Sequence, residues 1–262
     1  MPARWMVIAD VHLKADAPGR AELLKEAVRH ARELKVDALI NLGDLVSTGI
    51  ESEYRTALEI LSPIPKVIHV VGNHEVLEGS LADFRTHFGL EQGTPAIPGV
   101  SWPLTVLNSG IEGLSPQCWA GKLGKAALEL LASARSCPIV LCHHPVAGTV
   151  RRSEESMFGL DNSKDVLEIL QARTKPLLLI SGHTHMASRI KRGPITFMSS
   201  PPLGFWPHAF QIFEIEGDRL SFMTTQLVDN PNNSPDPEAK EATYRSASEG
   251  RQSDRCGTIM LR

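Results

Sequence analysis

The chain has 262 residues, enough for one large α/β domain or two small ones, and 42% of them are hydrophobic. Its net charge of −3 weighs against nucleic acid as a partner, although a local basic patch stays open. No apolar run reaches the roughly 18–20 residues of a membrane span, which argues against a membrane partner. The four cysteines form no CxxC pair, and the first apolar run is too short for a secretory leader, so we expect a cytoplasmic protein with reduced thiols.

From the N-terminus to residue 185, short β-branched apolar runs alternate with segments whose apolar residues recur at helical spacing. The first of these helical faces carries Leu24, Val28 and Ala31. The predicted strands cover residues 5–9, 37–41, 67–71, 104–108, 139–142 and 177–181. The predicted helices cover residues 20–34, 51–61, 80–88, 124–134 and 163–172.

After residue 185 the pattern changes to consecutive strands or hairpins, at residues 187–191, 194–199, 209–215 and 219–227. Strand–helix alternation followed by a run of strands predicts a layered α/β domain with mixed sheets, which we place at residues 1–228. Residues 229–262 are polar and rich in Pro, Ser and charged residues. We expect this segment to be a disordered tail or an arm lying on the surface.

Five of the predicted strands end in the same way, with Asp, Asn or His close behind the apolar run. These residues are Asp10 and His12, Asp44, Asn73 and His74, His143 and His144, and His183 and His185. In open α/β sheets, ligands bind at the carboxyl ends of strands, so we expect these side chains to meet at one edge. Any single one of them has a plain alternative as a solvated turn or a strand-end residue. Five such endings in one chain favour a shared site.

The residue types of this site suit divalent transition metals, because carboxylate, imidazole and amide oxygen bind manganese, iron or zinc and no thiolate is offered. The candidates are too numerous for a single tetrahedral ion. Two ions about 3.5–4 Å apart need a bridging ligand, and a carboxylate can bridge them. Asp44, alone behind its glycine, is the natural candidate for the bridge. The site therefore predicts two divalent metal ions as cofactors.

The order of these motifs resembles that of the calcineurin-like metallophosphoesterases. The motifs stand here as Asp10-Val11-His12, Gly43-Asp44, Gly72-Asn73-His74-Glu75, His143-His144-Pro145 and Gly182-His183-Thr184-His185. Together they span residues 10–185. The resemblance implies a hydrolase built as a four-layer αββα sandwich, with two mixed β-sheets and a dinuclear metal site at the C-terminal ends of the strands.

Carried over residue by residue, the resemblance assigns one metal to Asp10, His12, Asp44 and His185. It assigns the other metal to Asp44, Asn73, His143 and His183. His74 would be the catalytic residue that protonates or stabilises the leaving oxygen. Glu75 stands where many relatives have Asp, and its implied role is to orient His74.

Within this family, the chain length, the GNHE motif and the stretch Gly159-Leu160-Asp161-Asn162 are similar to the class III cyclic nucleotide phosphodiesterases. The resemblance places Asn162 near the substrate. It implies a phosphodiesterase that cleaves 3′,5′-cyclic nucleotides or similar small phosphodiesters through a metal-bridging hydroxide. The small phosphoester is then the partner of the site, and a homodimer is compatible with the resemblance.

Alternatives stay open because the metal motifs alone do not choose the ester. One is a broad-specificity phosphomonoesterase or a nucleotide pyrophosphohydrolase of the same superfamily. Another, of a different class, is a metal-poor protein-binding scaffold with this fold. We expect specificity to reside in the cap segments 92–122, 146–162 and 201–209. In the second of these, Arg151 and Arg152 meet a phosphate or are simply solvated, and the solvated interpretation is favoured.

Overall fold

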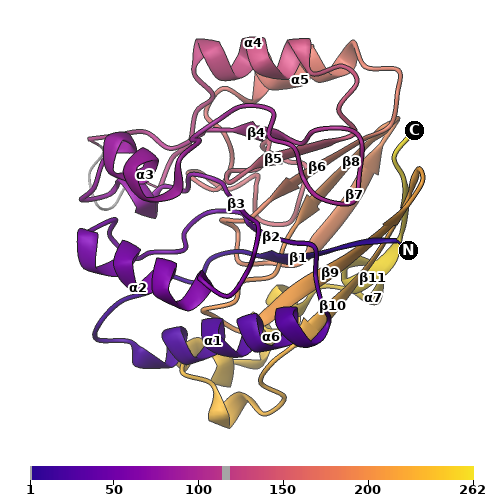
Figure 1. Ribbon diagram of the computed structural model, residues 1–262. Helices are drawn as coiled ribbons and strands as arrows, with labels where there is room; N and C mark the ends of the chain where they lie inside the picture. Colours follow the sequence, from indigo (N-terminus) through magenta and orange to yellow (C-terminus); the bar gives the residue numbers. More distant parts are fainter. Residues whose placement is uncertain (1, 114–118) are drawn as a thin grey trace.

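The computed structural model describes residues 2–113 and 119–262, which form two β-sheets covered by helices (Figure 1). The first sheet has the strand order β11-β10-β9-β1-β2-β3. Its strands are β1 (Ala3–Ile8), β2 (Ala38–Asn41), β3 (Val67–His69), β9 (Ala209–Glu216), β10 (Arg219–Gln226) and β11 (Cys256–Met260). Strands β1, β2 and β3 run parallel, whereas β9 pairs with β1 in the antiparallel sense. Trp5 marks the change of direction, since it pairs with Ala38 on one side and Phe213 on the other.

The second sheet has the strand order β4-β5-β6-β8-β7. Its strands are β4 (Thr105–Leu107), β5 (Ile139–Cys142), β6 (Leu177–Ser181), β7 (Ser188–Arg192) and β8 (Ile195–Ser199). The first four strands in this order are parallel, and β7 pairs with β8 as an antiparallel edge strand. Both sheets are therefore mixed, and the expected α/β fold with two mixed sheets is confirmed.

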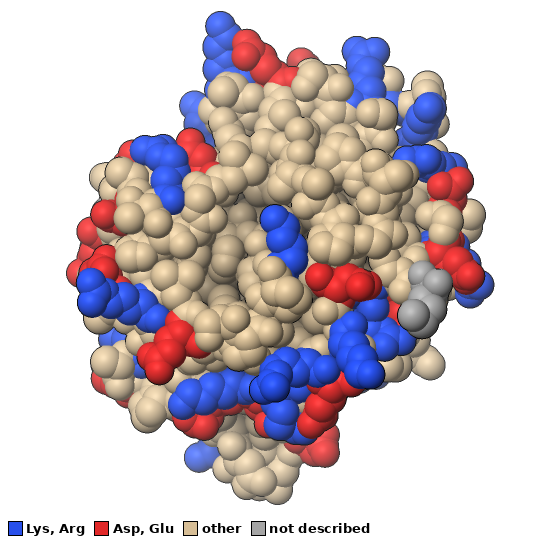
Figure 2. Space-filling view, in the orientation of Figure 1, with Lys and Arg blue, Asp and Glu red and all other residues tan. Residues whose placement is uncertain are grey.

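Helices α1 (Pro18–Glu33) and α2 (Glu51–Leu61) lie on one side of the paired sheets, and α4 (Lys125–Ser133) and α5 (Ser163–Gln171) lie on the other (Figure 1). Helix α3 (Leu81–Phe88) belongs to the connection from β3 of the first sheet to β4 of the second. On the solvent face of α1, Lys25 and Arg29 pair with Glu22 and Glu26. Figure 2 shows Lys and Arg interspersed with Asp and Glu over this lower part of the surface. None of the helices in the described ranges is long and apolar enough to cross a membrane.

Three hydrophobic clusters hold the layers together. One lies between the two sheets and packs Trp5 and Ile40 of the first sheet with Leu141 and Ile180 of the second. Another joins the opposite face of the first sheet to α1 and α2, and a third joins the opposite face of the second sheet to α4 and α5. Strands covered on both faces are continuous apolar runs in the sequence, and each predicted strand and helix up to residue 227 has its counterpart in the structure.

The polar C-terminal segment is folded over its described length. It contains the short 3₁₀ turns η2 (Pro231–Asn233) and η3 (Pro237–Lys240), the helices α6 (Ala242–Glu249) and α7 (Gln252–Arg255), and strand β11. Strand β11 pairs with β10, and its Ile259 joins the core between the sheets. We call residues 229–249 the C-terminal arm. The domain boundary at residue 228 stays a prediction.

Candidate metal centre

The parallel strands of both sheets deliver the predicted metal ligands to one edge. Asp10 follows β1, Asp44 follows β2 and Asn73 follows β3, all in the first sheet. In the second sheet, His143 follows β5 and His183 follows β6. The strand ends are tied together, because the Asp10 backbone N–H donates to Gly43 O at 3.1 Å and the Gly182 N–H donates to His143 O at 3.0 Å. All seven predicted ligands are buried except His185, which is partly exposed.

The side chains of these residues converge. Asp10, His12 and His185 offer ligand atoms within 4.8 Å of one another, and so do Asp10, Asp44 and His143. The Asp44 carboxylate is the shared member, since its Oδ2 lies 3.6 Å from His12 Nε2 and 3.1 Å from His143 Nε2. On the far side, His185 Nε2 lies 3.7 Å from Asp10 Oδ1. Asp44 thus occupies the central position that a bridging ligand needs.

Three buried polar atoms of this cluster have no hydrogen-bond partner among the described residues: His12 Nε2, His143 Nε2 and Asn73 Oδ1. An unpaired buried polar atom costs about 1–3 kcal/mol, so three of them in one place indicate that a ligand binds there. Two rings of the cluster are held by their other nitrogen, because His143 Nδ1–H donates to Leu42 O at 2.8 Å and His183 Nε2–H donates to Met157 O at 2.9 Å. These bonds fix the two rings and turn the remaining nitrogen of each toward the cluster, which fits divalent cations.

His143 and Asp44 attract each other strongly enough to outweigh burial, which raises the pKa of His143 to about 9 and lowers the pKa of Asp44. Elsewhere in the cluster, burial works against charge. It raises the pKa of Asp10 to about 8 and the pKa of Glu75 to about 7. It lowers the pKa of His183 and the pKa of His185 to about 3, so both imidazoles are neutral at physiological pH. Neutral imidazoles are the form that binds metals, and bound cations would offset the cost of the buried carboxylates.

The backbone of the cluster is also unusual. Asp10, His12, Asp44, His183 and His185 all have positive φ values, between 51° and 66°. Such left-handed conformations cost non-glycine residues of the order of 1–3 kcal/mol each, and they persist where the surrounding structure imposes them. Nearby, Gly72 approaches Asp44 so closely that a Cβ atom would lie 2.2 Å from Asp44 Oδ1. The side chains of the cluster are therefore brought together at the expense of local backbone strain.

His74 and Glu75 diverge from the predicted partnership. The ring of His74 packs edge-to-face on His12 with centroids 4.3 Å apart, and its Nδ1–H donates to Ser47 O at 2.5 Å. The Glu75 carboxylate accepts hydrogen bonds from the backbone N–H groups of Asp44 at 2.9 Å and Gly72 at 2.7 Å. The expectation that Glu75 orients His74 is therefore corrected, because the buried carboxylate holds the backbone around Asp44 instead.

Asn162, predicted to lie near the substrate, has both ends of its amide bonded to the backbone. It lies at the start of α5, where its Oδ1 accepts from Leu123 N–H at 3.1 Å and its Nδ2 donates to Leu123 O at 2.9 Å. Both ends of the amide are thus used to fix the neighbouring loop, and Asn162 does not line the cleft over the cluster. Contact of Asn162 with substrate stays a prediction.

A cleft of about 490 Å³ opens over the cluster. His12, Asp44, Asn73, His74, His183 and His185 line it. Cap residues predicted to carry specificity also line it, among them Trp119, Phe158 and Phe205. Arg152, for which the solvated interpretation was favoured, lies in the same wall. Asp236 and Tyr244 of the C-terminal arm complete the lining, which the polar composition of the arm gave no reason to expect.

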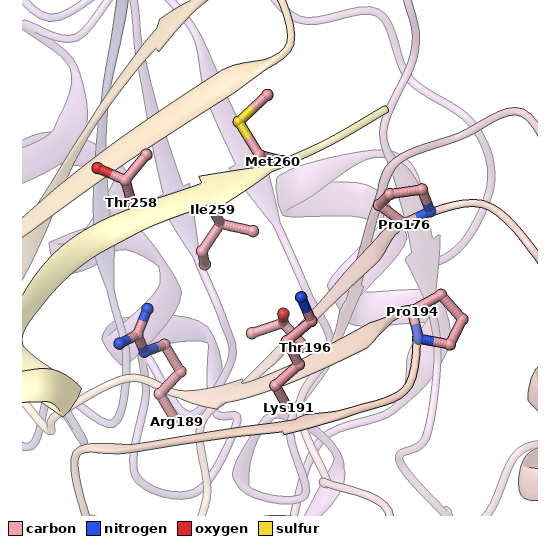
Figure 3. A pocket seen from close by; sticks show the side chains of 8 residues that line it. All are labelled: Pro176, Arg189, Lys191, Pro194, Thr196, Thr258, Ile259 and Met260. Carbon is pink, nitrogen blue, oxygen red and sulfur yellow. The ribbon is translucent and has the colours of Figure 1, made fainter.

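A second hollow, of about 440 Å³, lies between β7, β8 and β11 (Figure 3). Arg189 and Lys191 of β7 and Ile259 and Met260 of β11 are among the residues that line it. None of its lining residues belongs to the metal cluster. It therefore offers positions for control substitutions far from the proposed chemistry.

Comparisons with known proteins identify the family of this chain. The family model described as calcineurin-like phosphoesterase matches residues 3–187. A protein of Vesicomyosocius okutanii named "Probable cyclic nucleotide phosphodiesterase" is 25% identical over 180 residues, which cover 68% of this chain and 75% of that protein. A protein of Synechococcus with a similar name is 25% identical over 207 residues, covering 74% of this chain and 78% of the relative.

Two solved structures show the same fold at low sequence identity. A dimetal phosphatase from Danio rerio has a TM-score of 0.75 and 18% identity, and the match covers 87% of this chain and 98% of that structure. A purple acid phosphatase from yellow lupin has a TM-score of 0.60 and 13% identity, covering 100% of this chain and 57% of that structure. The family model covers most of the chain, including all five motifs from Asp10 to His185. The chain therefore belongs to the calcineurin-like phosphoesterase family and is a metal-dependent phosphoesterase.

Proposed function

We propose that this protein hydrolyses small phosphodiesters, with 3′,5′-cyclic nucleotides as the favoured class. The observation that carries the proposal is the convergence of unpartnered ligand atoms of His12, His143 and Asn73 around the Asp44 carboxylate. The names of the curated relatives support the choice of a cyclic nucleotide over other esters.

In this proposal, residues that follow strands of both sheets bind the two cations. Asp10, His12, Asp44 and His185 hold one of them. Asp44, Asn73, His143 and His183 hold the other. When bound, two divalent cations lower the pKa of a water molecule toward neutrality and offset the negative charge of the phosphoryl group.

His74 acts on the leaving oxygen. Its Nδ1–H is held by Ser47 O, which fixes the ring. In the imidazolium form Nε2 carries the second proton, which passes to the leaving oxygen and leaves the neutral ring with its proton on Nδ1. The ring lies in the lining of the cleft beside His12, within reach of a phosphoryl group bound over Asp44.

The size of the cleft favours a substrate larger than a bare phosphoryl group. A volume of about 490 Å³ falls in the range of pockets that enclose whole small molecules. A cyclic nucleotide has a single negative charge on its diester, and its ribose and base would fill the remainder of the cleft between the cap segments.

A substrate panel with the Mn²⁺-loaded protein tests the proposal. The panel contains bis-p-nitrophenyl phosphate, p-nitrophenyl phosphate, cyclic AMP, 2′,3′-cyclic nucleotides and ADP-ribose. We expect the diesters and cyclic AMP to be cleaved with higher kcat/KM than the monoester and ADP-ribose. The reverse order would assign a phosphomonoesterase or pyrophosphohydrolase. A protein that takes up no metal by elemental analysis and cleaves none of the esters would assign the metal-poor scaffold.

Replacement of His74 by Asn separates catalysis from metal binding. If His74 supplies the proton, its loss lowers kcat by roughly 10²–10⁴ for an alkoxide leaving group. Metal content measured by elemental analysis stays at the wild-type value, because His74 is not assigned as a ligand. Asp44→Ala is the contrasting variant, and it loses both turnover and metal.

A further inference from the structure

We propose that Trp119, backed by Phe158 and Arg152, forms a stacking shelf that selects phosphodiesters carrying a nucleobase. This inference rests on the proposed phosphodiesterase function and names the part of the substrate that the cleft recognises beyond the phosphorus atom. The three residues belong to the cleft lining and come from two separate cap segments.

Trp119 is an exposed aromatic side chain at the site. It is 39% exposed, and within residues 2–113 and 119–262 it is the one aromatic among the large apolar side chains that are exposed. Exposed apolar surface inside a cleft marks a binding site more often than exposure on a convex surface does. An indole face is well suited to a planar base, because every nucleobase has a π-face that can stack on it.

Phe158 packs against Trp119, and Arg152 packs against Phe158, so the shelf is held in place by these contacts. Phe158, which is 8% exposed, meets Trp119 edge-to-face with centroids 5.8 Å apart and an interplanar angle of 66°. The Arg152 guanidinium lies 3.7 Å from the centroid of the Phe158 ring. The aromatic wall also reaches the metal cluster, since the Phe158 ring lies 5.5 Å from the ring of His183. A base on this wall would therefore lie close to a phosphate bound at the cluster.

Hydrogen bonds fix the shelf relative to the predicted metal ligands. His144, the neighbour of His143, places its Nε2–H against Trp119 O at 3.0 Å, while its Nδ1 accepts from Ser109 Oγ–H at 2.8 Å. On the other side, His183 donates to the backbone of Met157, which directly precedes Phe158. The distance between a bound phosphate and a stacked base is thus set by the fold, which is the condition for selecting one class of ester.

Phe205, another aromatic ring of the cleft, already has stacking partners. It stacks on His185 with centroids 4.4 Å apart, and the Arg20 guanidinium lies 4.5 Å from its centroid. The charge around the shelf also favours a neutral group, because Arg152 Nε lies 3.5 Å from Glu155. A base fits this balance better than the second phosphate of a pyrophosphate does.

Two esters with the same leaving group test the inference on the Mn²⁺-loaded protein. Thymidine 5′-p-nitrophenyl phosphate carries a base, and methyl p-nitrophenyl phosphate does not. We expect the wild type to prefer the thymidine ester, and Trp119→Ala to lower the ratio of the two kcat/KM values by about 5- to 140-fold, the size of one base-stacking contact. Trp119→Phe keeps most of the preference, because a phenyl ring can still stack on the base.

Met260→Ala is the matched control, because it removes an exposed apolar side chain from the second hollow (Figure 3). It should keep the wild-type ratio. An active Trp119→Ala enzyme with an unchanged ratio overturns the shelf and leaves the phosphodiesterase proposal standing. A wild type that cleaves neither ester overturns both.

Binding to the wild type gives a second measurement that needs no variant. AMP should bind more tightly than ribose 5-phosphate, because only AMP carries a base that can stack on Trp119. AMP should also quench the tryptophan fluorescence, because Trp119 is exposed in the cleft whereas Trp5, Trp102 and Trp206 are buried. Equal affinity for the two ligands, with no quenching by AMP, would also overturn the shelf.

Discussion

At the scale of single residues, Glu75 shows how one buried carboxylate can hold several strand ends. It is fully buried and accepts hydrogen bonds from the backbone N–H groups of Asp44, Leu45 and Gly72, which belong to two different loops. These loops carry the central carboxylate and the neighbouring amide ligand candidate. The geometry of the metal centre therefore depends on a residue that is not itself assigned as a ligand.

Replacement of Glu75 by Gln keeps the shape of the side chain but turns an amide N–H₂ toward backbone donors. We expect metal affinity to fall by roughly 10–100-fold and the free energy of unfolding of the metal-free protein to fall by about 1–3 kcal/mol. Metal titration and urea unfolding measure the two effects. Glu78→Gln, at an exposed position three residues further on, is the control, and equal metal affinities in the two variants would contradict the role given to Glu75.

His69 carries a prediction on pH. Its ring stacks on Phe88 with centroids 3.9 Å apart, and burial lowers its pKa to about 3. The unfolded chain takes up this proton near pH 6.5, whereas the folded chain does so only near pH 3, so the stabilising contribution is complete above pH 6.5 and is lost as pH falls toward 3. For one proton the slope is at most about 1.4 kcal/mol per pH unit.

The variant His69→Phe keeps the stacking on Phe88 and removes the titrating group. We expect its free energy of unfolding to fall less steeply than that of the wild type between pH 6.5 and pH 5. Urea unfolding at several pH values measures both slopes. Parallel curves for the two proteins would refute the assignment.

At the scale of elements, the sequence predicts what depends on neighbours along the chain. The strands that lead into Asp10, Asp44 and His143 are covered on both faces, so they are short continuous apolar runs, and these runs located the strands and the residues behind them. The hydrogen-bond partners of Glu75 and Asn162 could not be found from the sequence, because they lie about 30 and 39 residues away in the chain and no local pattern encodes such contacts.

Strand β11 was not predicted, because it too depends on contacts with distant parts of the chain. It is a short edge strand in a polar segment, and of its five residues only Ile259 is buried. Its position depends on pairing with β10, where Leu220 lies opposite Ile259. The same applies to the C-terminal arm, whose place at the cleft depends on contacts with distant loops.

Asp236 anchors this arm and allows a test of its role. Its carboxylate is buried and accepts from the backbone N–H of Trp206 at 2.9 Å and of Glu238 at 3.0 Å. In Asp236→Ala both bonds are lost, so we expect about 1–3 kcal/mol lower stability, faster proteolytic cleavage within residues 229–249, and a higher KM at nearly unchanged kcat. Glu241→Ala, at an exposed position of the arm, should keep wild-type values. If Asp236→Ala kept the wild-type KM and the wild-type rate of proteolysis, the arm would have no role in substrate binding.

At the scale of the whole molecule, the metal centre joins the two sheets. Asp10, Asp44 and Asn73 come from the first sheet, and His143 and His183 come from the second, so each proposed cation contacts residues from both. Without cations, this junction contains buried carboxylates with raised pKa values and imidazole atoms without partners. Metal binding should therefore stabilise the entire fold rather than one loop.

Removal of the metals measures this coupling. A cation present at 100 times its Kd adds about 2.7 kcal/mol to the free energy of unfolding, which for a domain of this size raises Tm by roughly 5–11 °C per cation. Treatment with a chelator should lower Tm by at least that amount, and Mn²⁺ should restore it. His74→Asn should show the same shift as the wild type, because its ligands are intact, whereas Asp44→Ala should show little shift because the shared carboxylate is gone. If Tm in the wild type did not respond to chelation and readdition of Mn²⁺, the two sheets would not be joined by cations at this edge.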